Sequence, residues 1–297
     1  MKKKISLFIT MIMILGLFAG CSSKDKIVIA SKQFTENILL SEMYAQLVEN
    51  RTDVKVERKQ NLGGTSVIFP SMKNGEIDMY LEYSGTAYNE ILKLEADENL
   101  TSEEIYNTSK EKLASDHGIT MFKPIGINNT FAIAVLKRKA EEMNLKSISD
   151  LSTPSANFKF GANHLFYTRV SDGYDSLVKT YGLSFKEALK MDNSLLYDAI
   201  SQNKVDIMVV YATDSLLKKF DMVILEDDKE LFPAYYGTPL VRNEALEKYP
   251  ELKEVFDLLA DKFDDAKMQE LCYQVDVENK TVEEVATAFL TEQGLLK

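Results

Sequence analysis

Short apolar runs and stretches with helical spacing of apolar residues alternate along most of the chain. Runs of strand type cover residues 27–30, 54–58, 77–81, 131–136, 158–161, 205–210 and 222–225. Helical spacing covers residues 172–181, 195–203, 251–262, 266–275 and 282–293, and an earlier helix is expected with Ile38, Leu39, Met43, Tyr44, Leu47 and Val48 on one face. Strands that alternate with helices in this way predict open α/β sheets.

The pattern occurs in two blocks, and no low-complexity linker separates them. We therefore expect two α/β lobes joined by crossing segments, with a cleft between the lobes. Ligands of open α/β sheets collect at the carboxyl ends of the strands, so the loops at 31–36 and 82–86 are the first candidates for a binding site. The turn at 62–66 is expected to open a helix, in which Pro70 predicts a kink or a late start.

The first twenty residues predict export. Three lysines at 2–4 precede an almost unbroken apolar run over residues 5–18, and two small residues lead into Cys21. This layout is typical of a secretory signal peptide (residues 1–20), too short to remain as a membrane span. A cysteine directly after the small pair indicates a bacterial lipoprotein that is cleaved before Cys21 and acylated on it, with residues 21–26 as a tether. An ordinary signal peptide with a chance cysteine is the alternative.

Composition narrows the function. Without the three lysines of the leader the chain carries 32 basic against 46 acidic residues, a net charge of −14, which disfavours a nucleic-acid partner. Cys272 is the one thiol left after Cys21, so we expect no intrachain disulfide and a fold that is stable through its core alone. No segment after the leader is apolar enough to cross a membrane, so a soluble extracytoplasmic body is expected.

The sequence contains few residues in the patterns that are typical of catalytic sites. The two histidines, His117 and His164, lie in different segments, and no metal-ligand cluster, nucleophile elbow or phosphate loop is present. Gly63-Gly64-Thr65 resembles an anion-binding turn at a helix start, but two glycines are too few for a nucleotide site. We expect a protein that is not an enzyme and that needs neither a cofactor nor a metal.

Eight short strings in register resemble one family, the glycine betaine/carnitine/choline-binding proteins of osmoprotectant ABC importers. The strings are Lys32-Gln33-Phe34-Thr35-Glu36, Asn61-Leu62-Gly63-Gly64-Thr65, Asn74-Gly75-Glu76-Ile77-Asp78, Glu82-Tyr83-Ser84-Gly85-Thr86, Asn129-Thr130-Phe131-Ala132, Asp172-Gly173-Tyr174, Val210-Tyr211-Ala212-Thr213-Asp214, and Asp227-Asp228-Lys229 with Phe232-Pro233. Together they cover essentially the whole mature chain. Any single string is weak evidence for the family, but eight strings in the family's order are specific to it.

The resemblance implies an α/β type II periplasmic-binding-protein fold, in which two lobes close on a ligand held in the cleft between them. It implies that lobe one comprises residues 27–128 plus 237–297 and lobe two residues 129–236. It also implies the solute-binding lipoprotein of an ABC importer, held by its lipid at the extracytoplasmic face of the bacterial cell membrane. The permease and the ATPase would then be separate chains.

The family holds quaternary ammonium solutes in a cage of aromatic rings, because a trimethylammonium group is fully charged but has no N–H. Carried over residue by residue, the cage would consist of Tyr83, Phe131, Tyr211 and Tyr235. Phe131 stands where the family more often has tyrosine, so it keeps the ring without the hydroxyl. Rings that contribute about 0.5–2 kcal/mol each would account for micromolar binding, about −8 kcal/mol. Packing in the core is the alternative for each ring.

Four polar residues are further candidates for ligand contact. Arg169 matches the position at which some relatives hold the ligand carboxylate, a task for which a planar guanidinium is suited, and a solvated surface arginine is the alternative. Thr86 and Gln33 are candidate hydroxyl and amide contacts, with capping of the following helix as the alternative. Lys32 would serve the same anionic end.

We therefore expect the ligand to be a quaternary ammonium compatible solute: glycine betaine, carnitine or choline. Two alternatives remain at this stage. One is the same fold binding another betaine such as ergothioneine, and the other is a surface lipoprotein without a transport function.

Overall fold

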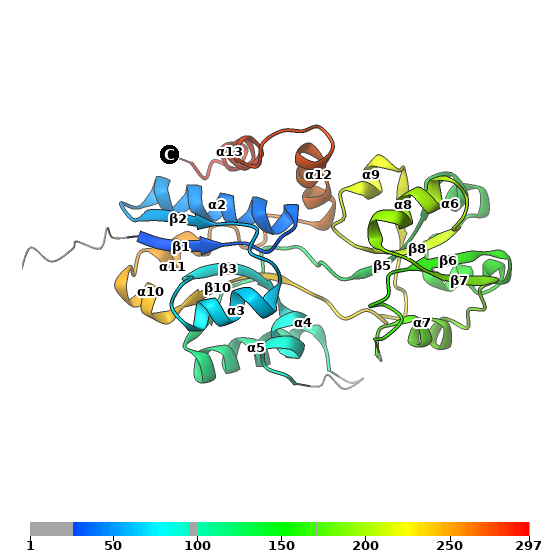
Figure 1. The fold of residues 1–297 in the computed structure, drawn as a ribbon, viewed down its shortest axis with the longest axis horizontal. Helices are drawn as coiled ribbons and strands as arrows, with labels where there is room; N and C mark the ends of the chain where they lie inside the picture. The colour runs from blue at the N-terminus through cyan, green and yellow to red at the C-terminus, as the bar shows by residue number, and fades with distance from the viewer. Residues whose placement is uncertain (1–25, 95–99, 170, 297) are drawn as a thin grey trace, which may run out of the picture.

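A computed structural model describes residues 26–94, 100–169 and 171–296 of the protein. The described chain forms two α/β lobes that lie end to end, each built around one five-stranded sheet (Figure 1). The signal peptide and Cys21 lie outside the described residues. Among the described residues, no helix combines the length and the apolar character that a membrane span requires.

The sheet of the first lobe has the strand order β2-β1-β3-β10-β4. Its parallel strands β1, β2 and β3 are joined by β10, which runs antiparallel to both β3 and β4. The strands are β1 (Lys26–Ala30), β2 (Lys55–Lys59), β3 (Met79–Tyr83), β4 (Ile119–Met121) and β10 (Gly237–Arg242). The helices are α2 (Thr35–Arg51), α3 (Thr65–Lys73), α4 (Ser84–Thr86), α5 (Ser102–His117), α10 (Asn243–Lys248), α11 (Leu252–Phe256), α12 (Asp265–Asp276) and α13 (Val282–Glu292), with a π-helical turn at Ala87–Ile91.

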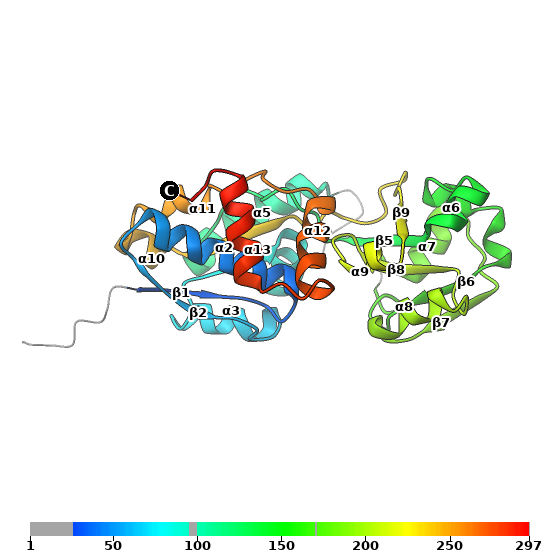
Figure 2. The same cartoon turned by 90° about the horizontal axis from the view of Figure 1, so that it is seen from above.

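Helices cover both faces of this sheet. One face packs against α2, α11, α12 and α13 through a large apolar core, and the other packs against α3 and α5 (Figures 1 and 2). Because both faces are covered, β1 and β3 consist largely of buried residues.

The sheet of the second lobe has the order β7-β6-β8-β5-β9. Its strands are β5 (Phe131–Leu136), β6 (Lys159–Ala162), β7 (Glu187–Lys190), β8 (Ile207–Tyr211) and β9 (Met222–Leu225). Its helices are α6 (Lys137–Met143), α7 (Tyr174–Tyr181), α8 (Asn193–Ser201) and α9 (Leu216–Lys219), with 3-10 turns at Ile148–Leu151 and Pro154–Asn157. Residues of α6 and α7 belong to the core on one face, and residues of α8 and α9 to the core on the other.

Two segments connect the lobes, residues 122–130 between β4 and β5, and residues 226–236 between β9 and β10. They pair with each other: Asn128 and Tyr236 form an antiparallel bridge, and Asn129 N donates to Tyr235 O at 3.1 Å. Gly126 has φ 107°, and a Cβ there would lie 2.0 Å from the carbonyl oxygen of Phe263. Only glycine allows this conformation and this close approach between the first crossing segment and the first lobe.

Several expected elements differ from the observed ones. Strands 131–136 and 222–225 are confirmed at their limits, whereas the expected strand 77–81 lies two residues later, as β3. The helix at the glycine turn begins at Thr65 and continues through Pro70, so the late start was wrong. Lys26, assigned to the tether, is the first residue of β1. The limits of the lobes stay a prediction.

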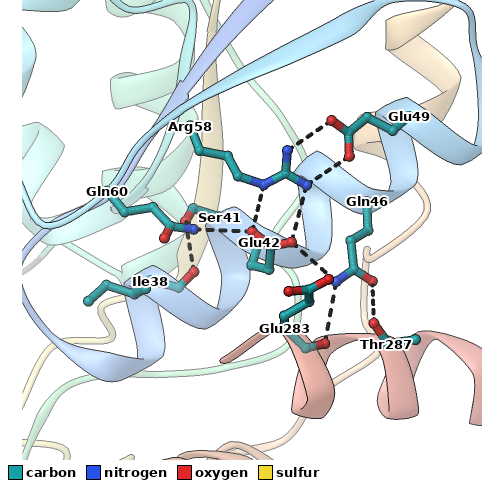
Figure 3. Close-up of polar contacts among 9 residues, drawn as sticks. All are labelled: Ile38, Ser41, Glu42, Gln46, Glu49, Arg58, Gln60, Glu283 and Thr287. Atoms are coloured by element: carbon teal, nitrogen blue, oxygen red, sulfur yellow. Dashed lines mark hydrogen bonds and ion pairs between the residues drawn. The ribbon is translucent and has the colours of Figure 1, made fainter. Parts of the chain in front are cut away.

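Helix α2, which carries part of the site at its first turn, is tied to its neighbours by a polar network (Figure 3). Arg58 of β2 donates to Glu42 and to Glu49 of α2 at 2.8 Å each. Gln46 of α2 accepts a 3.0 Å hydrogen bond from Thr287 of α13. These contacts hold the helix between β2 and α13.

Candidate ligand-binding site

A cavity of about 560 Å³ lies between the two lobes and the segments that connect them. Its walls come from the first turn of α2, the end of β3 with α4 and the π-helical turn, the crossing segments, the loop between β6 and α7, the loop after β8, and α12. The lining residues are Phe34, Thr35, Glu36, Tyr83, Gly85, Thr86, Asn89, Glu90, Asn129, Phe131, Leu165, Arg169, Tyr211, Thr213, Asp214, Ser215, Tyr235, Cys272 and Asp276. The volume is that of a small-molecule site.

All four aromatic residues of the expected cage line this cavity. Phe131 and Tyr211 face each other across the β5–β8 ladder, and their rings stack with centroids 5.3 Å apart. Tyr83 is the last residue of β3, and Tyr235 comes from the second crossing segment. The rings therefore come from both lobes and from the connection between them.

A fifth ring was missed by the sequence reasoning. Phe34 precedes α2, is 39% exposed, and stacks on Tyr83 with centroids 6.2 Å apart. Phe34 lies in the first candidate loop, within the string Lys32-Gln33-Phe34-Thr35-Glu36, and this position could have indicated it as a site residue.

Arg169 lies at the cavity wall and is held by three hydrogen bonds to two residues. Its Nε donates to Asp172 Oδ1 at 2.6 Å, its Nη2 bonds to the other carboxylate oxygen, and Nη2 also donates to the hydroxyl of Tyr235 at 2.7 Å. The guanidinium carbon lies 5.2 Å from the centroid of the Phe131 ring. Asp172 is buried, so the arginine is fixed in one orientation beside the rings.

Glu36 is a buried carboxylate in the cavity wall that the sequence reasoning also missed. Its Oε1 accepts hydrogen bonds from the hydroxyl of Tyr83 and from Asn129 Nδ2, the latter at 3.0 Å. Burial raises the pKa of Glu36 above its usual value, and these hydrogen bonds oppose the rise. Burial also raises the pKa of Asp214 in the same cavity. The cavity thus has acidic groups as well as rings and one arginine.

The structure does not bring two of the expected contacts into the cavity. Lys32 is buried in an ion pair with Glu82, which also accepts hydrogen bonds from Thr65 at 2.8 Å and Tyr80 at 3.0 Å. Its ammonium lies 5.0 Å from the centroid of the Tyr83 ring, and Lys32 is not a lining residue. Gln33 is exposed and outside the lining set, whereas Thr86 lines the cavity.

Ring faces and carboxylates together suit a cation that has no N–H to donate. The rings offer a negative quadrupole and apolar contact, and the carboxylates offer charge. Among the described residues, no group of three or more His, Cys, Asp and Glu side chains could hold a metal ion.

Two lobes of this topology with a cavity between them define a solute-binding protein of the type II periplasmic-binding-protein fold. The family model described as the substrate binding domain of ABC-type glycine betaine transport system matches residues 25–292, so the chain belongs to that family. Members are extracytoplasmic substrate-binding proteins that bind small ligands and work with permease subunits, and they are not enzymes. The fold class and the family expected from the sequence are confirmed.

Two curated relatives and one solved structure illustrate the similarity. An ergothioneine transport permease/ergothioneine binding protein of Helicobacter pylori is 33% identical over 97% of this chain, which spans only 52% of that protein. A glycine-betaine-binding protein of Pseudomonas aeruginosa is 35% identical over 95% of this chain and 92% of its own. A solved glycine betaine/carnitine/choline ABC transporter structure superposes with a TM-score of 0.85 at 28% identity, covering 92% of this chain and 100% of that one. The protein is the substrate-binding component of an ABC transporter of this kind.

Proposed function

We propose that the protein captures a zwitterionic quaternary ammonium solute, glycine betaine or carnitine, with choline as the weaker candidate. The observation that carries the proposal is the set of rings Tyr83, Phe131, Tyr211 and Tyr235 around one cavity that also holds Arg169. The rings would surround the trimethylammonium group, and each would contribute about 0.5–2 kcal/mol to the binding free energy. The guanidinium would meet the carboxylate of the ligand, which choline lacks.

Binding would proceed by closure of the lobes and without chemistry. Tyr83 belongs to the sheet of the first lobe, whereas Phe131 and Tyr211 belong to the sheet of the second. A ligand that contacts rings of both lobes favours the closed arrangement over an open one, because only the closed arrangement supplies all the contacts. The closed form would then dock on the permease.

The membrane attachment and the partners complete the proposal. A lipid on Cys21 would hold the protein at the outer face of the bacterial membrane, with a tether that ends before Lys26, the first residue of β1. The permease and ATPase would be separate chains.

The test is isothermal titration of the mature chain without its lipid (residues 22–297) against glycine betaine, carnitine, choline and ergothioneine. We expect micromolar binding of at least one zwitterion, loss of binding in Tyr211→Ala, and retention of most of it in Tyr211→Phe, which keeps the ring. Equal loss in both variants would count against the ring as the binding element. If none of the four compounds gives heat or thermal protection, the quaternary ammonium proposal fails.

Ergothioneine is the second candidate because the relative from Helicobacter pylori is named for it. It carries the same trimethylammonium head, so the rings serve both candidates equally. Tight binding of ergothioneine with weak binding of glycine betaine would select this alternative.

A further inference from the structure

Gly85 lies in the cavity wall within α4, and its backbone does not explain why the residue is glycine. Its φ is not in the left-handed region, so the conformation itself would accept other residues. A Cβ at this position, however, would lie 2.6 Å from Cε1 and 2.8 Å from both Cδ1 and Cζ of Tyr235. The ring of Tyr235 therefore occupies the space that a side chain at position 85 would need.

The ring cannot shift freely, because Tyr235 is fixed along its length. Its backbone N donates to Asn128 Oδ1 at 2.6 Å, and its carbonyl accepts from Asn129 N at 3.1 Å. At the other end, its hydroxyl accepts the hydrogen bond from Arg169 at 2.7 Å. A side chain at position 85 would therefore displace the ring and strain the contacts at both of its ends.

We infer that Gly85 is a positioning residue for the cage, and that the absence of its side chain sets where the Tyr235 ring lies. The inference rests on the proposed function, since it concerns the ring expected to contact the ligand. A Cβ reaches ordinary van der Waals contact at about 3.4 Å, so alanine would push the nearest ring atom by about 0.8 Å. That displacement changes the distance from the ring to the ligand and the hydrogen bond to Arg169 together.

The first measurement compares Gly85→Ala with the wild type by titration of whichever quaternary ammonium ligand the wild type binds. We expect the affinity to fall on the order of tenfold, because this is the contribution of one well-placed ring to the binding free energy. Gly64→Ala is the matched control, because a Cβ at Gly64 meets nothing within 4 Å and its φ is not left-handed. Wild-type affinity in Gly85→Ala overturns the inference.

The double variant Gly85→Ala/Tyr235→Ala separates positioning from general damage. If Gly85 acts through Tyr235, the double variant binds as weakly as Tyr235→Ala and no more weakly, and its melting temperature equals that of Tyr235→Ala. Multiplicative losses in the double variant would show that Gly85 acts through other neighbours, and would overturn the inference.

A readout without ligand keeps the inference distinct from the proposed function. In protein labelled with 3-fluorotyrosine, the ¹⁹F resonance of Tyr235, assigned with Tyr235→Phe, is expected to shift in Gly85→Ala and to stay in place in Gly64→Ala. If the wild type binds none of the four compounds but the resonance shifts, the proposed function fails and the positioning role stands. An unshifted resonance refutes the positioning role whatever the ligand.

Discussion

The hydroxyl of Ser215 donates a 2.6 Å hydrogen bond to Oδ2 of Asp276, and this bond joins the two lobes at the wall of the cavity. Ser215 follows β8 in the second lobe, and Asp276 is the last residue of α12 in the first. The other oxygen of Asp276 accepts from Thr35 at 2.5 Å, at the start of α2. In Figure 2, α12 and α9 lie next to each other where the lobes meet.

Removing this bond is expected to favour the open form. In Ser215→Ala the closed form loses one hydrogen bond to a charged group, about 1 kcal/mol at a partly exposed site, so ligand dissociation should be about fivefold faster. Stopped-flow dissociation measures it, and small-angle scattering should show a larger radius of gyration at subsaturating ligand. Ser201→Ala is the control, because Ser201 bonds to Asp198 O within α8 alone. Unchanged dissociation in Ser215→Ala would exclude a role of this bond in closure.

Arg169→Lys should discriminate between ligands. Lysine cannot reproduce the two contacts with Asp172 and the contact with Tyr235 that the planar fork makes. We expect the affinity for glycine betaine or carnitine to fall at least about tenfold, and the affinity for choline, which has no carboxylate, to change little. Competitive titration of the three ligands checks this. An equal loss for choline would mean that Arg169 acts by holding the rings.

Glu36 should make folding stability depend on pH. Burial raises its pKa above the usual 4.5, so the folded protein binds the proton more tightly than the unfolded chain does. Between 4.5 and the raised pKa the free energy of unfolding therefore falls as pH rises, and below 4.5 this contribution is constant. Asp214 is half-buried, its pKa is raised by the same cause, and it acts in the same direction.

Replacing the carboxyl group tests this assignment. Urea unfolding of Glu36→Gln across this pH range should show a smaller loss of stability with rising pH than the wild type shows. Glu283→Gln, at an exposed site on α13, should keep the wild-type slope. A wild-type slope in Glu36→Gln would mean that other groups carry the pH dependence.

Cys272 should be unreactive in the folded protein. Cys272 is 3% exposed, and burial raises the pKa of its thiol well above the usual value, so little thiolate is present at neutral pH. In the lipid-free chain (residues 22–297), Ellman's reagent should modify the Cys272 thiol slowly in buffer and rapidly in denaturing urea. Rapid modification without urea, unaffected by ligand, would place the thiol in contact with solvent.

Tyr83, Phe131 and Tyr211 could be found from the sequence because each stands in one of the eight strings, next to a strand end. Tyr235 follows the last string by two residues. Tyr83 ends β3 and Tyr211 ends β8, and the carboxyl ends of strands are where such sheets bind ligands. The family resemblance rests on the same strings. That these side chains contact the ligand stays a prediction.

Strand β10 was missed because Gly237 and Pro239 are typical of a turn. Pro239 nevertheless lies in a central strand and accepts a hydrogen bond from Phe122 N at 2.9 Å. Its missing N–H would have bonded to Phe122 O, which instead accepts from the hydroxyl of Tyr106 at 3.1 Å. A substitute donor from α5, distant in sequence, makes the proline tolerable, and local sequence carries no sign of it.

By itself the sequence determined the α/β class, the strands at 131–136 and 222–225, and the family, because periodicity and short motifs are local properties. The tertiary structure alone decided which polar groups are available to a ligand. Lys32 is bound to Glu82, fifty residues away, and so lies outside the cavity, whereas Glu36 is brought into its wall beside Tyr83. Burial and pairing depend on residues far apart in the chain, and these set the charge that each side chain presents.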